Sequence, residues 1–391
     1  MLYLLEILFA LSPSYVVRFS FGALKLNLLE VLIPIFWILA LILLSKKGEL
    51  DKFFSFCKSI PKSVLIFTAI FFLASLLSTL ISPTKDRAFG QLLAYFVEPI
   101  ITFFFAGYIL REDHNKNRFL KFVLYYIALL SVYALIQYLT LAGLPKLWWG
   151  NSAEPKRALS IFEYPNAFAL FITPLLAYSL PIVFSGDKKN KHLKWLLLIG
   201  LFGLLVSLSR GGWIGFISAI FVFALVSAKK DLWKKLGVVA VLVIIVFSVV
   251  PNLRYRVLLP FKGEKSTVSR FSLWETADKM ISSSPILGKG LNGFATDFNF
   301  YNTDPGLAPL DYPHNIFLNF WVETGLLGLI SFLGLSISII WLGWQKFLKG
   351  SLYGLAIILF IIALYAHGMA DAPYFKNDLA LVFWIFASTV I

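Results

Sequence analysis

Apolar runs long enough to cross a lipid bilayer recur along the whole chain, and this feature limits the possible folds more than any other. A transmembrane helix needs about 20 mostly apolar residues. The chain has such runs from one end to the other, and only 14% of its 391 residues are charged, compared with about 25% in soluble domains. Because lipid offers the backbone no hydrogen bonds, these runs are expected to be helices. The sequence therefore predicts an all-α polytopic membrane protein, with one integral-membrane domain over residues 1–391.

Hydropathy predicts about 12 transmembrane helices. The predicted spans are residues 2–21, 26–44, 63–82, 89–110, 119–142, 161–184, 193–208, 211–228, 236–250, 314–341, 351–369 and 378–391. The first of these is the least regular, because Pro13 and Arg18 fall inside it.

One long loop, residues 251–313, separates the ninth and tenth spans. Within it, residues 269–281 place Phe271, Trp274 and Ile281 at helical spacing, which predicts an amphipathic helix lying on the membrane surface. A glycine-rich turn follows at residues 285–294, where the lack of side chains would let a ligand approach the backbone.

The positive charges indicate how the chain crosses the membrane. Five short loops contain 19 basic residues and all fall on the same side in this arrangement of spans: 46–62, 111–121, 188–194, 229–235 and 346–349. The positive-inside rule makes that side cytoplasmic, together with both termini. The net charge of +14 therefore reflects topology and contact with membrane lipids, and does not indicate a nucleic-acid partner.

Seven of the nine arginines fall on the outer side of this arrangement. A planar guanidinium matches the oxygens of a phosphate, so the bias favours an anionic ligand handled outside the cell membrane. Anchoring to lipid headgroups at the interface is an equally good explanation for any single outer arginine except Arg210 and Arg270, for which it is the weaker one.

Two arginines lie where a helix is predicted to begin. Arg210 opens a span and is followed by Gly211 and Gly212, and Arg270 opens the amphipathic loop helix. The positive end of the helix dipole repels a cation, whereas a bound anion would reverse that cost. The alternative is an internal ion pair with one of three glutamates, Glu163, Glu275 or Glu323.

His314, followed by Asn315, begins the predicted tenth span at the outer face. A helix N-terminus disfavours protonation of a histidine, and a neutral imidazole is what a general base requires near pH 7. His367, four residues before Asp371, is expected to form a structural pair with it and is the alternative base. A structural hydrogen bond at the helix start is the competing explanation for His314.

The sequence predicts neither a metal nor a cofactor. It contains one cysteine, Cys57, no metal-ligand spacing and no phosphate-binding loop of the nucleotide-hydrolase type. Glu98, like Glu323, is an ionisable group at membrane depth, where such groups are costly unless paired or functional.

Four ordered motifs resemble those of the O-antigen ligase and polymerase superfamily of bacterial membrane glycosyltransferases. The motifs are Ser-Leu-Ser-Arg210-Gly-Gly-Trp-Ile-Gly, then Ser269-Arg270 with Trp274, then Pro285 with Gly288 and Gly290, and then His314-Asn-Ile-Phe-Leu-Asn-Phe-Trp-Val-Glu323-Thr-Gly325-Leu-Leu-Gly328. Arg157 with Pro165-Asn166 fits the pattern upstream. The resemblance covers residues 157–378, the expected catalytic region.

The resemblance implies a metal-independent, inverting transferase that takes a glycan from undecaprenyl diphosphate at the outer leaflet of the bacterial inner membrane. It implies His314, Arg210 and Arg270 as catalytic residues. Seven further residues are expected to bind substrate: Arg157, Asn166, Gly211, Gly212, Trp274, Asn315 and Glu323.

The acceptor is expected to be lipid A core, as in lipopolysaccharide biosynthesis. Polymerisation of the glycan itself, or transfer to a protein hydroxyl, stays open within the same superfamily. A lipid flippase is disfavoured, because the unusual residues gather at the outer surface and not along a path at membrane depth.

Overall fold

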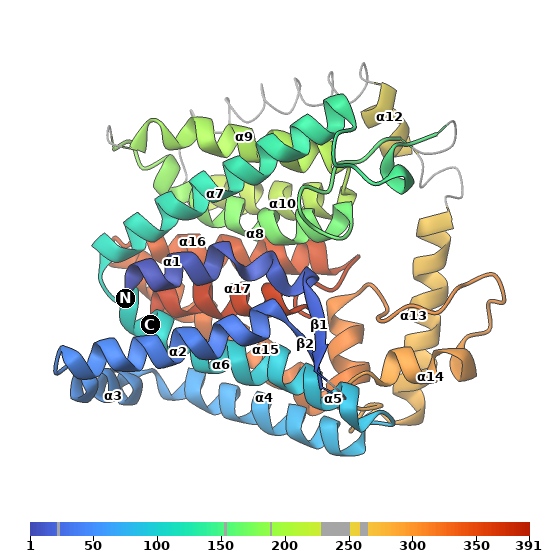
Figure 1. The fold of residues 1–391 in the computed structure, drawn as a ribbon, viewed down its shortest axis with the longest axis horizontal. Helices are drawn as coiled ribbons and strands as arrows, with labels where there is room; N and C mark the ends of the chain where they lie inside the picture. Colours follow the sequence, from blue (N-terminus) through green and yellow to red (C-terminus); the bar gives the residue numbers. More distant parts are fainter. Residues whose placement is uncertain (22–23, 152–154, 188–189, 228–250, 259–264) are drawn as a thin grey trace. The chain divides into compact units, whose positions relative to one another are not determined.

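A computed structural model of the chain describes residues 1–21, 24–151, 155–187, 190–227, 251–258 and 265–391, which are almost entirely helical (Figure 1). Two compact units are present. The first unit contains Met1–Val123, Arg270–Ile358 and Gly368–Ile391, and the second contains Leu124–Ser269 and Leu359–His367.

Seven helical segments within the described residues are long and apolar enough to cross a membrane, as a polytopic protein requires. They are Leu28–Lys46, Lys62–Ile81, Lys85–Ile109, Asp113–Thr140, Pro165–Val183, Arg210–Ser227 and Ile316–Leu348. Three shorter apolar helices cover Leu193–Val206, Leu352–Gly368 and Asn377–Val390. The predicted span at 236–250 lies outside the described residues, so the total of twelve stays a prediction.

The first unit begins with a broken segment, and the prediction of one helix over residues 2–21 is wrong. Helix α1 (Leu2–Ala10) is followed by a 3-10 turn, η1 (Ser12–Val16), and by an antiparallel hairpin of β1 (Arg18–Phe21) and β2 (Leu24–Asn27). Pro13 lies in the first turn of η1, where its missing N–H is tolerated. At about 1.5 Å per residue, α1 is too short to cross a bilayer.

The remaining helices of the first unit pack in long antiparallel and parallel contacts (Figure 1). Their bounds are α2 (Leu28–Lys46), α3 (Leu50–Ser59), α4 (Lys62–Ile81), α5 (Lys85–Leu92), the π-helical turn η2 (Leu93–Val97), α6 (Glu98–Ile109), α15 (Ile316–Leu348), α17 (Asn377–Ala387) and the 3-10 turn η6 (Ser388–Val390). Helix α15 packs along α4, and α17 packs along α6. Asn27 and Glu30 form a capping box that fixes the start of α2.

The predicted loop, 251–313, contains α12 (Pro251–Leu258), α13 (Lys265–Ser283) and α14 (Gly293–Tyr301). The amphipathic helix expected at 269–281 exists as α13, but it begins four residues earlier. Its buried face consists of Leu273, Ala277, Met280 and Ile281, and it packs on Phe294 and Phe298 of α14 and Val322 of α15.

Phe271, the first residue of the predicted apolar face, is 62% exposed, whereas Ile281 is buried in this cluster and Trp274 packs against it. Most of the apolar face of α13 therefore rests on protein, and contact of Phe271 with a membrane surface stays a prediction. Helix α14 and the beginning of α15 supply the partner surface, which helical spacing alone does not reveal.

The second unit is built around α8 (Pro165–Val183), which packs against both α9 (Leu193–Val206) and α10 (Arg210–Ser227). It also contains the 3-10 turn η3 (Lys146–Trp148), α12, most of α7 (Asp113–Thr140) and part of α16 (Leu352–Gly368).

Candidate functional site

His314 is paired with Asp371 just before α15 begins. Its Nδ1 atom lies 2.9 Å from Oδ1 of Asp371, although 57 positions separate the two residues. The Asp371 side chain is 1% exposed and that of His314 is 21% exposed. The same carboxylate oxygen accepts a hydrogen bond from the Ala372 amide at 2.9 Å. The pair thus combines a fixed, buried carboxylate with an imidazole that a ligand can reach.

This arrangement gives the two ring nitrogens of His314 different roles. A carboxylate beside Nδ1 favours the tautomer that carries its proton there, which leaves the lone pair of Nε2 to accept a proton. The carboxylate would also stabilise the imidazolium formed when Nε2 takes that proton. Tyr312 contacts the imidazole edge-on, with the ring centroids 4.9 Å apart. The geometry is that of a general base.

Asn315 holds the beginning of α15 in place. Its side-chain Oδ1 accepts hydrogen bonds from the amides of Phe317 and Leu318, and its Nδ2 donates to the carbonyl of Met369 at 3.3 Å. The side chain predicted to bind substrate is therefore an N-cap in this structure. It joins the start of α15 to the segment that carries Asp371, and so helps to position His314.

The alternative base, His367, lies in the second unit. Its side chain is only 1% exposed, so an acceptor hydroxyl has little access to it, whereas His314 is accessible. Asp371, the partner expected for His367, bonds to His314.

Glu323 caps the N-terminus of α14. Its carboxylate accepts hydrogen bonds from the amides of Asn292 and Phe294, the latter at 3.0 Å, and its side chain is buried. A helix start offers free N–H groups and the positive end of the dipole, so a carboxylate fits there. Glu323 was expected to bind substrate or to pair with an arginine. Its contacts instead make it a cap that fixes the turn before α14.

The glycine-rich turn between α13 and α14 is used for close packing within the protein. Gly288 has φ +70°, and a Cβ on it would lie 2.5 Å from the carbonyl oxygen of Val322 in α15. The turn also donates from the Lys289 amide to that carbonyl at 2.7 Å. Gly325, with φ +68°, interrupts α15 beside this contact. The backbone that approaches these glycines is that of α15, in place of the predicted ligand.

Arg270 lies in the second turn of α13, which begins at Lys265. The prediction that Arg270 stands at a helix start is therefore wrong, and the argument from the helix dipole does not apply to it. Trp274, one turn later, packs partly buried against the apolar cluster of α13. Its Nε1 atom is buried and has no hydrogen-bond partner within the part of the chain that the structure describes.

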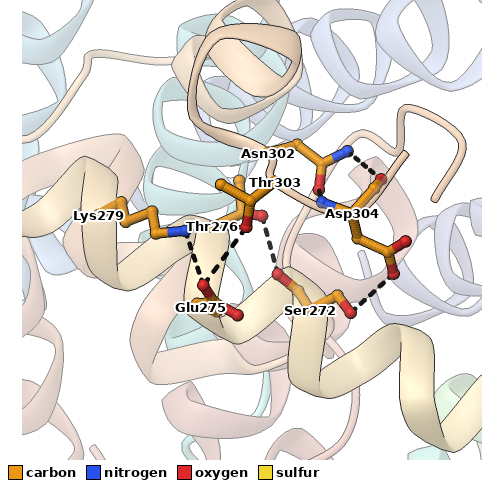
Figure 2. Close-up of polar contacts among 7 residues, drawn as sticks. All are labelled: Ser272, Glu275, Thr276, Lys279, Asn302, Thr303 and Asp304. Carbon is orange, nitrogen blue, oxygen red and sulfur yellow. Dashed lines mark hydrogen bonds and ion pairs between the residues drawn. The ribbon is translucent and has the colours of Figure 1, made fainter. Parts of the chain in front are cut away.

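Hydrogen bonds join the polar side of α13 to the segment after α14 (Figure 2). Lys279 donates to Glu275 at 2.6 Å and to Thr303 at 2.9 Å, and Ser272 donates to Asp304 at 2.9 Å. The hydrogen bond from Lys279 lowers the pKa of the Glu275 carboxyl. The helix that carries Arg270 is thus held both by its apolar face and by this polar edge.

In the second unit, Arg157 and Asn166, both expected to bind substrate, contact each other. Arg157 Nη2 donates to Oδ1 of Asn166 at 2.6 Å, and Arg157 Nε donates to the carbonyl of Ser207 at 2.9 Å. Arg256 Nε donates to the carbonyl of Leu208 at 3.1 Å. Two arginines therefore bind the turn that leads into α10. Leu208 in that turn has φ +50°, which is uncommon outside glycine.

Arg210 is the first residue of α10, as predicted. The two glycines after it serve packing, which corrects the expectation that a ligand approaches the backbone there. A Cβ on Gly211 would lie 2.5 Å from the His367 ring, and one on Gly212 would lie 2.8 Å from Leu204. Close contact of α10 with its neighbours in the second unit explains why side chains are missing at both positions.

Residues 195–333 match the family model described as O-Antigen ligase. This match confirms the predicted resemblance to the O-antigen ligase superfamily. The comparison with curated proteins finds no match.

Arg210, Arg270, His314 and Glu323 all fall inside the segment that matches the O-antigen ligase family. Asp371 and Arg256 are the two residues of interest that sequence reasoning did not assign to the site. Asp371 lies beyond the matched segment, and the sequence pointed to it only as the expected partner of His367, four residues before it. Among the described residues, no group of three or more His, Cys, Asp or Glu side chains is arranged to hold a metal ion.

Proposed function

We propose that this protein transfers a glycan from a lipid diphosphate, undecaprenyl diphosphate, to an acceptor hydroxyl, and that His314 is the general base. The observation that supports this most strongly is the His314–Asp371 pair, with its Nδ1–Oδ1 distance of 2.9 Å, inside or next to a segment that matches the O-antigen ligase family. The family supports a transferase of the ligase or polymerase type acting on lipid-linked glycans.

In the proposed reaction, Nε2 of His314 takes the proton of the acceptor hydroxyl. The oxygen forms a bond to the anomeric carbon as the bond from that carbon to the diphosphate oxygen breaks, so the configuration inverts. The lipid diphosphate leaves with the electron pair of the broken bond. Asp371 stabilises the imidazolium through Nδ1. On the sequence pattern, Arg210 and Arg270 remain the candidates for contact with the negative charge that grows on the leaving group.

Lipid A core is the acceptor we propose, with both termini in the cytoplasm and the reaction at the outer leaflet of the inner membrane. The description of the matching family as a ligase supports this choice. A polymerase would use the same donor chemistry but lengthen the glycan on a second lipid diphosphate.

The test is glycan transfer by purified protein in liposomes, with wild type beside His314→Ala. The donor is an undecaprenyl-diphosphate glycan, offered with lipid A core or alone. We expect transfer to core, reduced about 10²- to 10⁴-fold in the variant. His114→Ala, an exposed histidine at the start of α7, is the matched control and should retain activity. Longer glycans with donor alone would establish a polymerase. Full activity in His314→Ala would remove His314 from the mechanism.

A further inference from the structure

A short helix, α3, joins two membrane-spanning helices of the first unit. It lies between the end of α2 at Lys46 and the beginning of α4 at Lys62, so it must run near one membrane surface. Its buried residue, Phe53, stacks on Phe105 of α6 with the ring centroids 5.0 Å apart. Phe54 next to it is 54% exposed. The helix is therefore fixed to the protein on one side and leaves an aromatic side chain available to lipid.

An open pocket of about 550 Å³ lies between α3 and the end of α6. Helix α3 contributes Lys52, Ser55 and Ser59 to its wall, and the end of α6 contributes Tyr108 and Arg111. Cations and hydroxyl groups thus face a common space beside exposed apolar surface. The carboxylate of Asp51 also lines the pocket and opposes anion binding there.

The basic side chains that line this pocket have N–H donors that the protein itself does not use, so a ligand can accept from them. Arg111 Nη1 donates to the Tyr108 carbonyl at 2.7 Å, and Arg111 Nη2 lies 3.8 Å from Glu112, too far for a hydrogen bond. A guanidinium has five N–H donors, so most remain available. The guanidinium also lies 3.8 Å from the centroid of the Tyr108 ring, which restrains it. Lys52 is exposed and contacts no acidic group among the residues that the structure describes.

The charge around the pocket points to an anionic partner. Residues 46–62, from the last residue of α2 to the first residue of α4, contain five lysines and only two acidic residues, Glu49 and Asp51. Such an excess is typical of the cytoplasmic face, where the inner leaflet presents anionic headgroups. A lipid phosphodiester would meet two cations and two serine hydroxyls, while its acyl chains would lie beside the apolar helices.

We propose that this pocket binds the headgroup of an anionic glycerophospholipid. Lys52 and Arg111 contact the phosphodiester, and Ser55 and Ser59 contact the phosphate or the headgroup hydroxyls. The occupant is a lipid, because the apolar ring of Phe56 lines the pocket beside the two cations and because α3 joins two membrane-spanning helices. The inference is independent of the glycan reaction.

The test is retention of lipid by purified protein in detergent, measured by native mass spectrometry with phosphatidylglycerol or phosphatidylcholine added. We expect the wild type to bind one phosphatidylglycerol in preference to phosphatidylcholine. In Lys52→Gln with Arg111→Gln, that affinity should fall about 20- to 30-fold, from about fivefold for each cation near an anionic surface. Lys47→Gln with Lys58→Gln is the matched control, with the same charge change in or next to the same connection but outside the pocket, and should bind like wild type.

Two results would overturn the proposal. One is an equal loss of phosphatidylglycerol affinity in both double variants, which would mean that the positive charge of this region attracts the lipid without forming a defined site. The other is displacement of phosphatidylglycerol by millimolar inorganic phosphate, which would assign the pocket to a free anion. Because Arg111 also donates a hydrogen bond to the protein, its substitution could disturb the fold. Lys52→Glu is therefore measured as well; this variant should lose affinity for phosphatidylglycerol while the Arg111 hydrogen bond stays intact.

Discussion

His314 adopts a backbone conformation that histidine rarely takes. Its φ is +52°, and Leu208 and Asn292 also have positive φ values, each within a few residues of a helix start. Such conformations cost roughly 1–3 kcal/mol and persist where the surroundings impose them. For His314, the hydrogen bond to Asp371 and the cap formed by Asn315 impose it. The strain thus coincides with the residue that we propose as the base.

Asp371→Asn tests whether the carboxylate positions His314. An asparagine of nearly the same size keeps the packing but cannot stabilise an imidazolium by its charge. We expect kcat for glycan transfer to fall about 10²-fold or more, with little change in KM for the donor.

Asp378→Asn is the control for that experiment, since Asp378 is equally buried at the start of α17 in the same unit. A variant Asp371→Asn with wild-type kcat would contradict a positioning role. If kcat falls in both Asp371→Asn and Asp378→Asn, and both variants also lose thermal stability, the two buried carboxylates matter only for folding.

The sequence identified His314 but could not identify its partner. The position of His314 before an apolar run is a local signal, whereas its contact with Asp371 joins residues 57 positions apart. Glu323 was noticed because a carboxylate at membrane depth is unusual. Its role as a cap depends on α14, which lies 29 to 31 positions away in the chain. Local patterns therefore indicate which residues matter, and tertiary contacts decide what they do.

At the scale of elements, the cap formed by Glu323 predicts how α14 is held. Glu323→Gln replaces one of the two oxygens that accept from the Asn292 and Phe294 amides by an NH₂ group, which cannot accept. A buried amide left without its acceptor costs roughly 1–3 kcal/mol, so α14 should open more often. Hydrogen–deuterium exchange should show faster exchange over residues 292–301, by about tenfold.

Glu112→Gln provides the control, because Glu112 is an exposed glutamate next to Arg111, directly before α7 and far from α14 in the chain. Exchange over residues 292–301 should be unchanged in this variant. Unchanged exchange in Glu323→Gln as well would mean that the apolar contacts of Phe294 and Phe298 hold α14 without the cap.

Helix boundaries were predictable where hydropathy decides them and not where packing does. The second and third predicted spans end within two residues of α2 and α4, since apolar runs bounded by polar residues determine both. Helix α13 begins at Lys265, four residues before the predicted start, in a stretch without the apolar spacing on which the prediction relied. The break of α15 at Gly325 likewise depends on the turn packed against it.

For the whole molecule, the distribution of charge predicts which side each loop occupies. The protein has a single cysteine, Cys57, so Cys57→Ser provides a background for site-specific labelling. In that background, His114→Cys and Thr303→Cys place a thiol on two exposed positions, one at the start of α7 and one after α14. The positive-inside rule predicts His114 in the cytoplasm, and the proposed topology places Thr303 outside.

A membrane-impermeant maleimide added to intact cells should therefore label Thr303→Cys and leave His114→Cys unlabelled until the membrane is opened. The same experiment tests on which side of the membrane the proposed reaction takes place, because Thr303 and His314 lie in the same segment between α14 and α15. Lipid-linked glycans await transfer at the outer leaflet in the proposed reaction, so His314 must be on that side. Labelling of His114→Cys alone in intact cells would reverse the topology and contradict the proposed side of the reaction.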